Sequence, residues 1–291
     1  MREAPSSEAT RRTSVRDLRT EREGVGLAAR DSGLRRGEVV LLLHGSPQDS
    51  SCWDGVVPLL HAAGLRTLVM DQRGYGASGS PPGVAPYRTE ELAADVVAVL
   101  DAAGVRQAHV VGHDWGGAVA WHTAAHHADR VSTLTVLSTP HPAAYSWSLT
   151  HSRQPLLSWY TLAFQTPWLP ELVLAQVLEP VLAGGGLPPA TAHRYAERLR
   201  RPVALGPPLA WYRAAVRRPP WHAWRATPAV GVPTTYLWGR RDPALGRAAA
   251  ERTRRFVSGP YRFIELDEGH WLPELQPEAV ARAVASRVAG P

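Results

Sequence analysis

The chain of 291 residues contains no lysine, no asparagine and a single cysteine, Cys52. One cysteine excludes an intrachain disulfide and any metal cluster held by several thiolates, and it fits a reducing compartment. Because lysine is absent, all 32 basic residues are arginines, and they are spread along the chain rather than gathered at one motif. The net charge of +6 is therefore a compositional bias, and we expect no nucleic-acid binding.

Long hydrophobic runs are absent as well. No stretch reaches the roughly 18 apolar residues that a membrane span needs, and the first 20 residues lack the apolar core of a secretory signal. We expect residues 1–12 to form a disordered tail followed by a first strand, and the protein to be cytoplasmic. A composition of 44% hydrophobic and 20% charged residues is typical of a globular protein with a sizeable core.

Short apolar runs alternate with helical patterns through the first 140 residues, which is typical of βαβ units and a parallel sheet. The runs are continuous rather than alternating, as expected for strands buried on both faces. We expect strands at Val39–Leu43, Thr67–Met70, His109–Val111 and Val131–Leu137, and helices at Trp53–Ala63, Arg88–Ala103 and Trp115–His127.

The pattern changes between residues 141 and 230, which hold 13 of the 26 prolines and six of the 11 tryptophans. Helical pieces such as Thr191–Arg200 occur there, without a clear buried strand. Alternation resumes with expected strands at Thr234–Trp238 and Tyr261–Leu266 and a closing helix at Glu278–Val288. We therefore predict one α/β core, 13–140 and 231–291, with a helical cap, 141–230, inserted after the fourth strand.

A tight turn, Gly112-His113-Asp114-Trp115-Gly116, joins the predicted strand at 109–111 to the following helix. This is the layout of a nucleophile elbow, with Asp where Ser usually stands. The glycines leave room for a strained backbone, and the helix N-terminus favours a negative charge at Asp114. The same pattern is also typical of an Asp that caps a helix, so the motif alone leaves both interpretations open.

An elbow needs an acid and then a histidine later in the chain, each after a strand. Asp242 follows the strand at 234–238, and His270 follows the last strand. Asp267 and Glu268 are adjacent in the chain to the histidine and so are poorly placed to orient its ring. This order favours Asp114 as a nucleophile with His270 as base and Asp242 as its orienting acid.

The turn His44-Gly45-Ser46-Pro47 follows the first long strand. We expect it to present the backbone N–H of Ser46 beside that of Trp115, because two such donors form an oxyanion hole.

With these motifs the chain resembles the α/β-hydrolase superfamily over roughly residues 36 to 288. An Asp nucleophile narrows the resemblance to its epoxide hydrolases and its haloalkane or haloacid dehalogenases. The resemblance implies an α/β-hydrolase fold, a mostly parallel central sheet flanked by helices, with no cofactor and no metal. It also implies a substrate pocket with His44, Pro47 and Trp271 in its walls.

The leaving group separates epoxide from halide chemistry. An opening epoxide develops alkoxide character and needs an acid, which a Tyr hydroxyl with an ordinary pKa near ~10 supplies. Epoxide hydrolases that resemble this chain place two cap tyrosines over the nucleophile. The first lies in a Tyr-x-x-x-Phe-Gln-x-Pro segment, matched by Tyr160 to Pro167, and the second in a Trp-Tyr-Arg segment, matched at Tyr212. Either tyrosine could instead be a packing residue; the pair favours an epoxide.

Three alternatives remain open. A haloalkane dehalogenase would use the same Asp-His-Asp triad, although the absence of Asn excludes members that hold halide with an Asn side chain. Ser138-Thr139 offers no acid after the fourth strand, and Trp115 stands where fluoroacetate dehalogenases have Arg. A non-catalytic ligand-binding member usually loses a triad residue, whereas this chain keeps all three. Cyclisation of an epoxide by an internal hydroxyl would use the same tyrosines.

One position departs from the epoxide hydrolase pattern: Ser46 stands where an aromatic residue is common. The tryptophan-rich cap indicates an apolar epoxide as substrate, with water as co-substrate. A homodimer is compatible with the sequence, which predicts no nucleic-acid partner and no membrane span.

Overall fold

The computed structural model describes residues 13–217 and 227–290, so the predicted tail at 1–12 lies outside the described residues. At its centre is an eight-stranded sheet of order β1-β2-β4-β3-β5-β6-β7-β8. Strands β3 to β8 run parallel, whereas β1 and β2 are antiparallel to their neighbours. The strands are β1 (Thr13–Arg22), β2 (Val25–Leu34), β3 (Val39–Leu43), β4 (Arg66–Asp71), β5 (Ala108–His113), β6 (Val131–Leu137), β7 (Thr234–Gly239) and β8 (Tyr261–Leu266).

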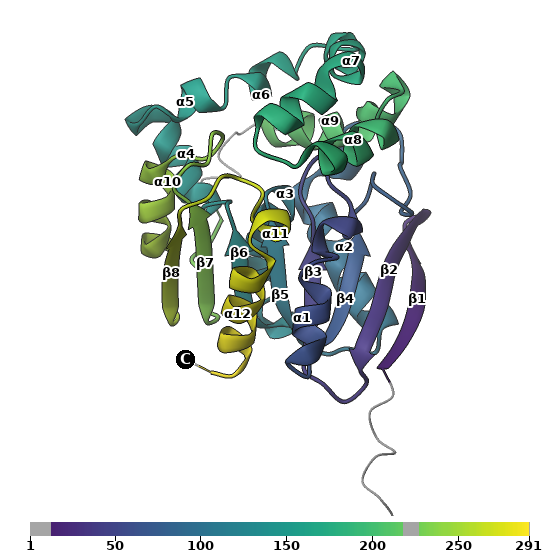
Figure 1. Ribbon diagram of the computed structural model, residues 1–291, viewed down its shortest axis with the longest axis vertical. Helices are drawn as coiled ribbons and strands as arrows, with labels where there is room; N and C mark the ends of the chain where they lie inside the picture. Colours follow the sequence, from purple (N-terminus) through teal and green to yellow (C-terminus); the bar gives the residue numbers. More distant parts are fainter. Residues whose placement is uncertain (1–12, 218–226, 291) are drawn as a thin grey trace, which may run out of the picture.

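Helices cover both faces of the sheet (Figure 1). Val40 and Leu42 of β3 pack on the side of α1 and α12, and Leu41 and Leu43 pack on the side of α2 and α3. All four side chains are fully buried, which confirms the prediction of strands covered on both faces. The core helices are α1 (Val57–Ala62), α2 (Thr89–Ala102), α3 (Trp115–His126), α10 (Arg247–Arg252), α11 (Leu272–Leu275) and α12 (Pro277–Val288).

The segment between β6 and β7 forms helices that lie across the carboxyl ends of the strands (Figure 1). The predicted helical cap after the fourth parallel strand is therefore confirmed. Within the described residues no helix is both long and apolar enough to span a membrane. The cap helices are α4 (Pro142–His151), α5 (Gln154–Leu157), α6 (Tyr160–Ala163), α7 (Leu169–Gly184), α8 (Pro189–Arg198) and α9 (Pro202–Arg217).

Two local predictions are wrong. The helix expected from Trp53 is split into a 3₁₀ turn at Ser50–Trp53 and α1, which begins at Val57 with Pro58 in its first turn. Proline fits there because first-turn N–H groups have no partner within the helix. The sequence also predicts one strand before the parallel sheet, whereas β1 and β2 form a hairpin that turns at Glu23 and Gly24.

Candidate active site

Asp114 lies between β5 and α3, with φ 49° and ψ −120°. A non-glycine residue in this region is strained and persists only where its surroundings hold it. A Cβ atom at Gly112 would collide with the carbonyl oxygen of Gly116, and one at Gly45 would collide with the Asp114 side chain. The Asp114 side chain makes no capping hydrogen bond to α3, a helix described in full. The geometry is that of the elbow rather than of a helix cap.

The turn after β3 faces the Asp114 carboxylate. The backbone N–H of Ser46 donates to Asp114 Oδ1 at 2.8 Å. Trp115 is the first residue of α3 and directly follows Asp114, so its backbone N–H lies at the N-terminus of the helix, where N–H groups point out of the helix. These are the two donors that the sequence predicts for an oxyanion hole.

His270 and Asp242 come together from loops that follow β8 and β7. His270 Nδ1 lies 2.8 Å from Asp242 Oδ2, and His270 Nε2 lies 3.5 Å from Asp114 Oδ2. The second oxygen of Asp242 accepts the backbone N–H groups of Ala244 at 2.8 Å and Leu245 at 3.0 Å. The three predicted triad residues therefore form one continuous chain of contacts.

The charges of the neighbouring carboxylates keep His270 protonated, and His270 in turn keeps Asp114 ionised. Burial disfavours a charge on His270, but the carboxylates of Asp242 and Asp114 outweigh that effect and raise the pKa of His270 to about 10. Burial likewise disfavours a charge on Asp114, yet its contact with His270 lowers the pKa of this carboxyl below its usual value. At neutral pH the resting site thus contains an Asp114 carboxylate facing an imidazolium.

Two tyrosines from different cap helices meet over this site. The rings of Tyr160 on α6 and Tyr212 on α9 have their centroids 6.2 Å apart, and the Tyr212 ring lies edge-on to Trp115 at 4.9 Å. Burial raises the pKa of both hydroxyls, and the negative charge of Asp114 raises it further. Both side chains are therefore close enough to Asp114 to sense its charge, and both stay protonated at neutral pH.

The three residues predicted for the pocket wall, His44, Pro47 and Trp271, lie in different surroundings. His44 is fully buried: its Nε2 accepts the N–H of Gln72 at 3.1 Å, so its Nδ1 donates to Gly45 O at 2.8 Å. This arrangement assigns His44 to holding the turn rather than to contacting a substrate. Trp271 packs edge-on against His270 at 5.0 Å and donates from Nε1 to Gly185 O in the cap at 3.0 Å.

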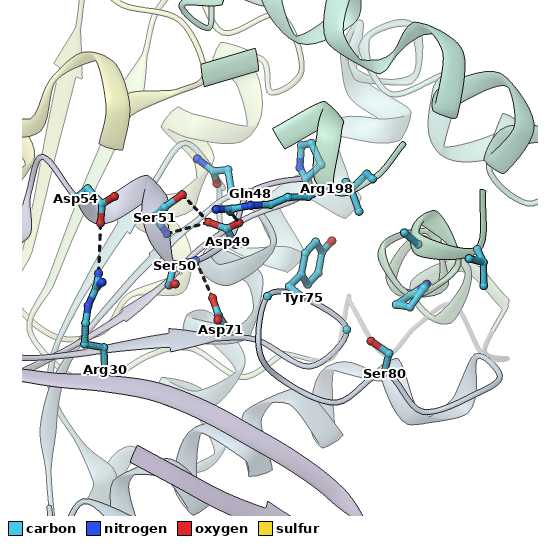
Figure 2. A pocket seen from close by; sticks show the side chains of 17 residues that line it. Arg30, Gln48, Asp49, Ser50, Ser51, Asp54, Asp71, Tyr75, Ser80 and Arg198 are labelled. Atoms are coloured by element: carbon cyan, nitrogen blue, oxygen red, sulfur yellow. Dashed lines mark hydrogen bonds and ion pairs between the residues drawn. The ribbon is translucent and has the colours of Figure 1, made fainter. Parts of the chain in front are cut away.

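Pro47 lines a pocket of about 740 Å³ between the loop after β3 and the cap helices α8 and α9 (Figure 2). Tyr75 and Gln48 line it as well. Arg198 of α8 reaches across to Asp49 and joins cap to core by an ion pair, as Figure 2 shows. This pocket, lined by both polar and apolar side chains, lies beside the turn that carries Ser46.

Sequence reasoning missed several residues behind His270. The carbonyl oxygen of His270 accepts the Ser138 hydroxyl at 2.8 Å and lies 2.9 Å from His113 Nε2. Gln48 and Glu274 continue this chain of contacts beyond His113. His113 directly precedes Asp114 in the elbow motif. Gln48 and Glu274 are far from it in sequence, and only the fold brings them close.

A carboxylate on a strained turn after a parallel strand, with an acid and a histidine after two later strands, has the layout of the α/β hydrolases. Comparison with known proteins agrees. The family model described as alpha/beta hydrolase fold matches residues 38–277. Epoxide hydrolase A of Mycobacterium tuberculosis is 32% identical, over 92% of this chain and 95% of its own. Epoxide hydrolase 3 of Xenopus tropicalis is also 32% identical, over 92% of this chain and 76% of its own.

Among solved structures, the crystal structure of epoxide hydrolase A from Mycobacterium thermoresistibile has a TM-score of 0.79 and 26% identity. The match covers 95% of this chain and 99% of that one. The chain belongs to the α/β-hydrolase fold family and, within it, to the epoxide hydrolases. The predicted family and fold class are confirmed.

Proposed function

We propose that this protein hydrolyses an apolar epoxide to a vicinal diol through a covalent ester on Asp114. The observation that supports this most strongly is that two protonated tyrosines meet over an ionised carboxylate that is itself in line with His270 and Asp242. A carboxylate needs no base to attack carbon, whereas the ring oxygen needs a proton donor.

In the first step a carboxylate oxygen of Asp114 attacks a ring carbon and the carbon–oxygen bond of the ring breaks. The electrons of that bond go to the ring oxygen, which takes a proton from Tyr160 or Tyr212. A raised pKa keeps both hydroxyls protonated beforehand, and the developing alkoxide is a strong enough base to remove the proton. The product is an alkyl ester on Asp114 with a neighbouring hydroxyl.

Ester formation removes the negative charge of Asp114. Because that charge helps to raise the pKa of His270, esterification lowers the pKa again. His270 then gives its extra proton, through water, to the tyrosinate that ring opening has left, and becomes a neutral base. His270 then takes a proton from water, which attacks the carboxyl carbon of Asp114. The Ser46 and Trp115 N–H groups stabilise the resulting oxyanion. As it collapses, the bond between the carboxyl carbon and the alkyl oxygen breaks, and this oxygen takes the proton back from His270, which releases the diol. The Asp114 carboxyl then gives its proton to His270 and restores the ionised pair.

Aromatic side chains surround the reacting position and indicate an apolar substrate. Phe164 lies 5.0 Å from Tyr212 and 5.5 Å from Tyr160, between ring centroids, and Trp115 completes the group. Such a surface binds apolar and aromatic groups well, with the two hydroxyls as its polar points.

The proposal is tested by incubating the protein separately with styrene oxide and with a haloalkane, then assaying diol and free halide. We expect diol from styrene oxide and no halide; halide release without diol would establish a dehalogenase, and neither product together with saturable binding would establish a non-catalytic ligand-binding protein. Replacing Tyr160 and Tyr212 together by Phe should slow ring opening roughly 10² to 10⁴-fold. Tyr261→Phe on β8 is the matched control, and unchanged turnover in the double variant would contradict the assigned acids.

A further inference from the structure

The outer edge of the cap, which lies farthest from the sheet, gathers exposed apolar side chains (Figure 1). Among the described residues twelve large apolar side chains are exposed, and ten of them lie between residues 149 and 181. We define the part formed by α5, α6 and α7 as the outer cap surface, with six exposed side chains: Leu156, Trp159, Leu162, Trp168, Val173 and Val181. Monomers rarely expose an apolar patch of this extent, which is typical of a surface that binds a protein or a membrane.

Helix α7 is apolar on two sides. Its inner side chains Leu178 and Leu182 are buried in a cluster that also contains residues of α8. On the outer side Val173, Val177 and Val181 form a row, one turn apart, and are 37% to 55% exposed. A surface helix of a globular protein normally has one apolar face, and a helix that is apolar all round is normally buried. In the part of the chain that the structure describes, the outer row of α7 therefore lacks the cover that its composition predicts.

Trp168, the residue before α7, has a strained backbone. Its φ is 50°, a region that bulky side chains avoid and that glycine and asparagine tolerate. Its side chain is 68% exposed, so burial within the chain offsets little of the strain. Strained residues are concentrated at binding and catalytic sites. The backbone of Trp168 thus indicates a binding role for this indole, independently of the exposed apolar area.

The outer cap surface is nearly free of negative charge. Residues 154–170 contain no charged residue. On α7, Glu171 pairs with Arg213 at 2.6 Å, and the two side chains are 12% and 10% exposed. Glu179 lies 3.0 Å from His193 of α8. A negatively charged partner therefore meets little repulsion at this surface.

Exposed arginines flank the same surface. Arg153 directly precedes α5, and Arg217, the last residue of α9, donates to two oxygens of Gln165 in the turn between α6 and α7. Residues 141–217 contain seven arginines, three glutamates and no aspartate, so the cap holds +4 of the net charge of +6. A positive potential thus surrounds an apolar surface that carries two exposed tryptophans.

We propose that the outer cap surface binds the surface of a lipid bilayer that contains anionic lipids. Tryptophan is favoured at the level of the headgroups, and each arginine next to an anionic leaflet strengthens binding severalfold. The leucines and valines enter the outer acyl region, as the apolar face of an interfacial helix does. A second copy fits less well. A two-fold contact pairs a surface with itself, and it would bring the flanking arginines of both copies into one interface.

Binding to a bilayer places the cap where an apolar epoxide accumulates, because apolar molecules partition from water into lipid. Trp159 directly precedes Tyr160, one of the two proton donors in the proposed reaction. The helix α6, which faces the lipid, is thus also the one that carries part of the active site. This advantage rests on the proposed function, whereas lipid binding itself does not.

Flotation of the full chain with lipid vesicles tests the proposal in the absence of any epoxide. The vesicles contain phosphatidylcholine alone or with about 30% phosphatidylglycerol, in about 0.1 M salt. The wild type should float with the anionic vesicles, and less so in about 1 M salt. Trp159→Gln together with Trp168→Asn should weaken binding roughly 10 to 100-fold, and asparagine tolerates the positive φ at this position.

The control for this pair is Val15→Gln on β1, where the side chain is 73% exposed and far from the cap. It should bind as the wild type does. Failure of the wild type to bind anionic vesicles, or equal binding by the double tryptophan variant, overturns the proposal.

A second pair of variants separates placed charge from net charge. Arg153→Gln with Arg217→Gln should weaken binding to the anionic vesicles roughly tenfold. Arg36→Gln with Arg106→Gln removes the same charge just before β3 and β5, and should weaken binding less than about twofold. All four arginines are exposed, so these variants keep the test decisive if the tryptophan variant fails to fold. Equal loss in both pairs overturns the proposal.

Light scattering without lipid identifies the other occupant. A wild-type dimer that the double tryptophan variant converts to a monomer would assign this surface to a second copy and overturn the proposal. Vesicle binding without diol formation would support lipid binding and contradict the proposed function, and diol formation without vesicle binding would do the reverse.

Discussion

The core and the cap contribute to the same site by different physical means. In the core, Leu41, Leu42 and Leu43 of β3 are fully buried, and the backbone around Asp114 packs so closely that a Cβ atom at Gly112 or Gly116 would collide with it. In the cap, by contrast, Trp159 and Trp168 on either side of α6 are 66% and 68% exposed. Asp114 is thus held by closely packed backbone, whereas Tyr160 and Tyr212 lie in a thinner and more exposed layer of helices.

Buried apolar side chains of α7, α8 and α9 pack against the core, and several hydrogen bonds join cap and core as well. Trp211 Nε1 donates to Arg73 O at 3.1 Å, Gln154 Nε2 donates to Ala244 O at 2.6 Å, and Trp271 Nε1 donates to Gly185 O. Substitutions in the core should therefore change the chemistry of the ester with little change in cap order, and substitutions in the cap should affect ring opening first.

The largest effect is expected from Asp242→Asn in the core. An amide presents a donor as well as an acceptor to His270 Nδ1 and allows the wrong tautomer, so hydrolysis of the ester should slow roughly 10³ to 10⁴-fold. Ester formation should proceed, because Asp114 remains ionised. Rapid-quench measurement of both steps checks this, with the exposed Asp267→Asn as control. Equal slowing of both steps would contradict the assigned role.

An intermediate effect is expected from Arg213→Met in the cap. Arg213 is buried; it pairs with Glu171 at 2.6 Å and donates to Phe164 O at 2.9 Å and Thr166 O at 2.8 Å. Removing it leaves the Glu171 carboxylate without its partner, which should destabilise the cap by about 3 kcal/mol. Hydrogen exchange should then rise around Tyr160 while β3 to β6 stay protected. The exposed Arg201→Met is the control; uniform exchange throughout the sheet would show that cap and core unfold together.

The smallest effect is expected from Gly206→Ala inside α9. A Cβ atom there meets nothing within 4 Å, and alanine is the better helix former by about 0.5–1 kcal/mol. The midpoint of urea unfolding should rise slightly with unchanged turnover. The same substitution at Gly45 should abolish turnover, because its Cβ would occupy the position of the Asp114 side chain. Equal behaviour of the two variants would contradict the comparison of cap with core.

Much of the fold and the triad can be predicted from sequence, because Asp114, Asp242 and His270 each follow a parallel strand and the carboxyl ends of parallel strands lie at one edge of the sheet. The predictions of β3 to β8 and of the cap are confirmed on this basis. The tyrosine motifs identify Tyr160 and Tyr212 in the sequence. They do not predict where these side chains lie relative to Asp114, because that depends on how the cap packs on the core. Cytoplasmic location and a homodimer stay predictions.

The network behind His270 could not be predicted in the same way. Gln48 and Glu274 are 226 residues apart in the chain and belong to no common motif. Glu274 lies on α11, a helix of four residues whose direction depends on packing against the 3₁₀ turn at Ser50–Trp53. The family resemblance likewise implies a place for His44 in the pocket wall, whereas its side chain is buried and bonds to Gln72 and Gly45.

The central claim is that Asp114 forms a covalent ester, and the most direct test is mass spectrometry of His270→Gln after exposure to styrene oxide. Without its base the protein should accumulate the ester, so the peptide containing Asp114 should gain the mass of one epoxide. The exposed His193→Gln control should turn over and show no added mass. An unmodified Asp114 peptide in His270→Gln, with styrene oxide confirmed as a substrate of the wild type, would contradict the account.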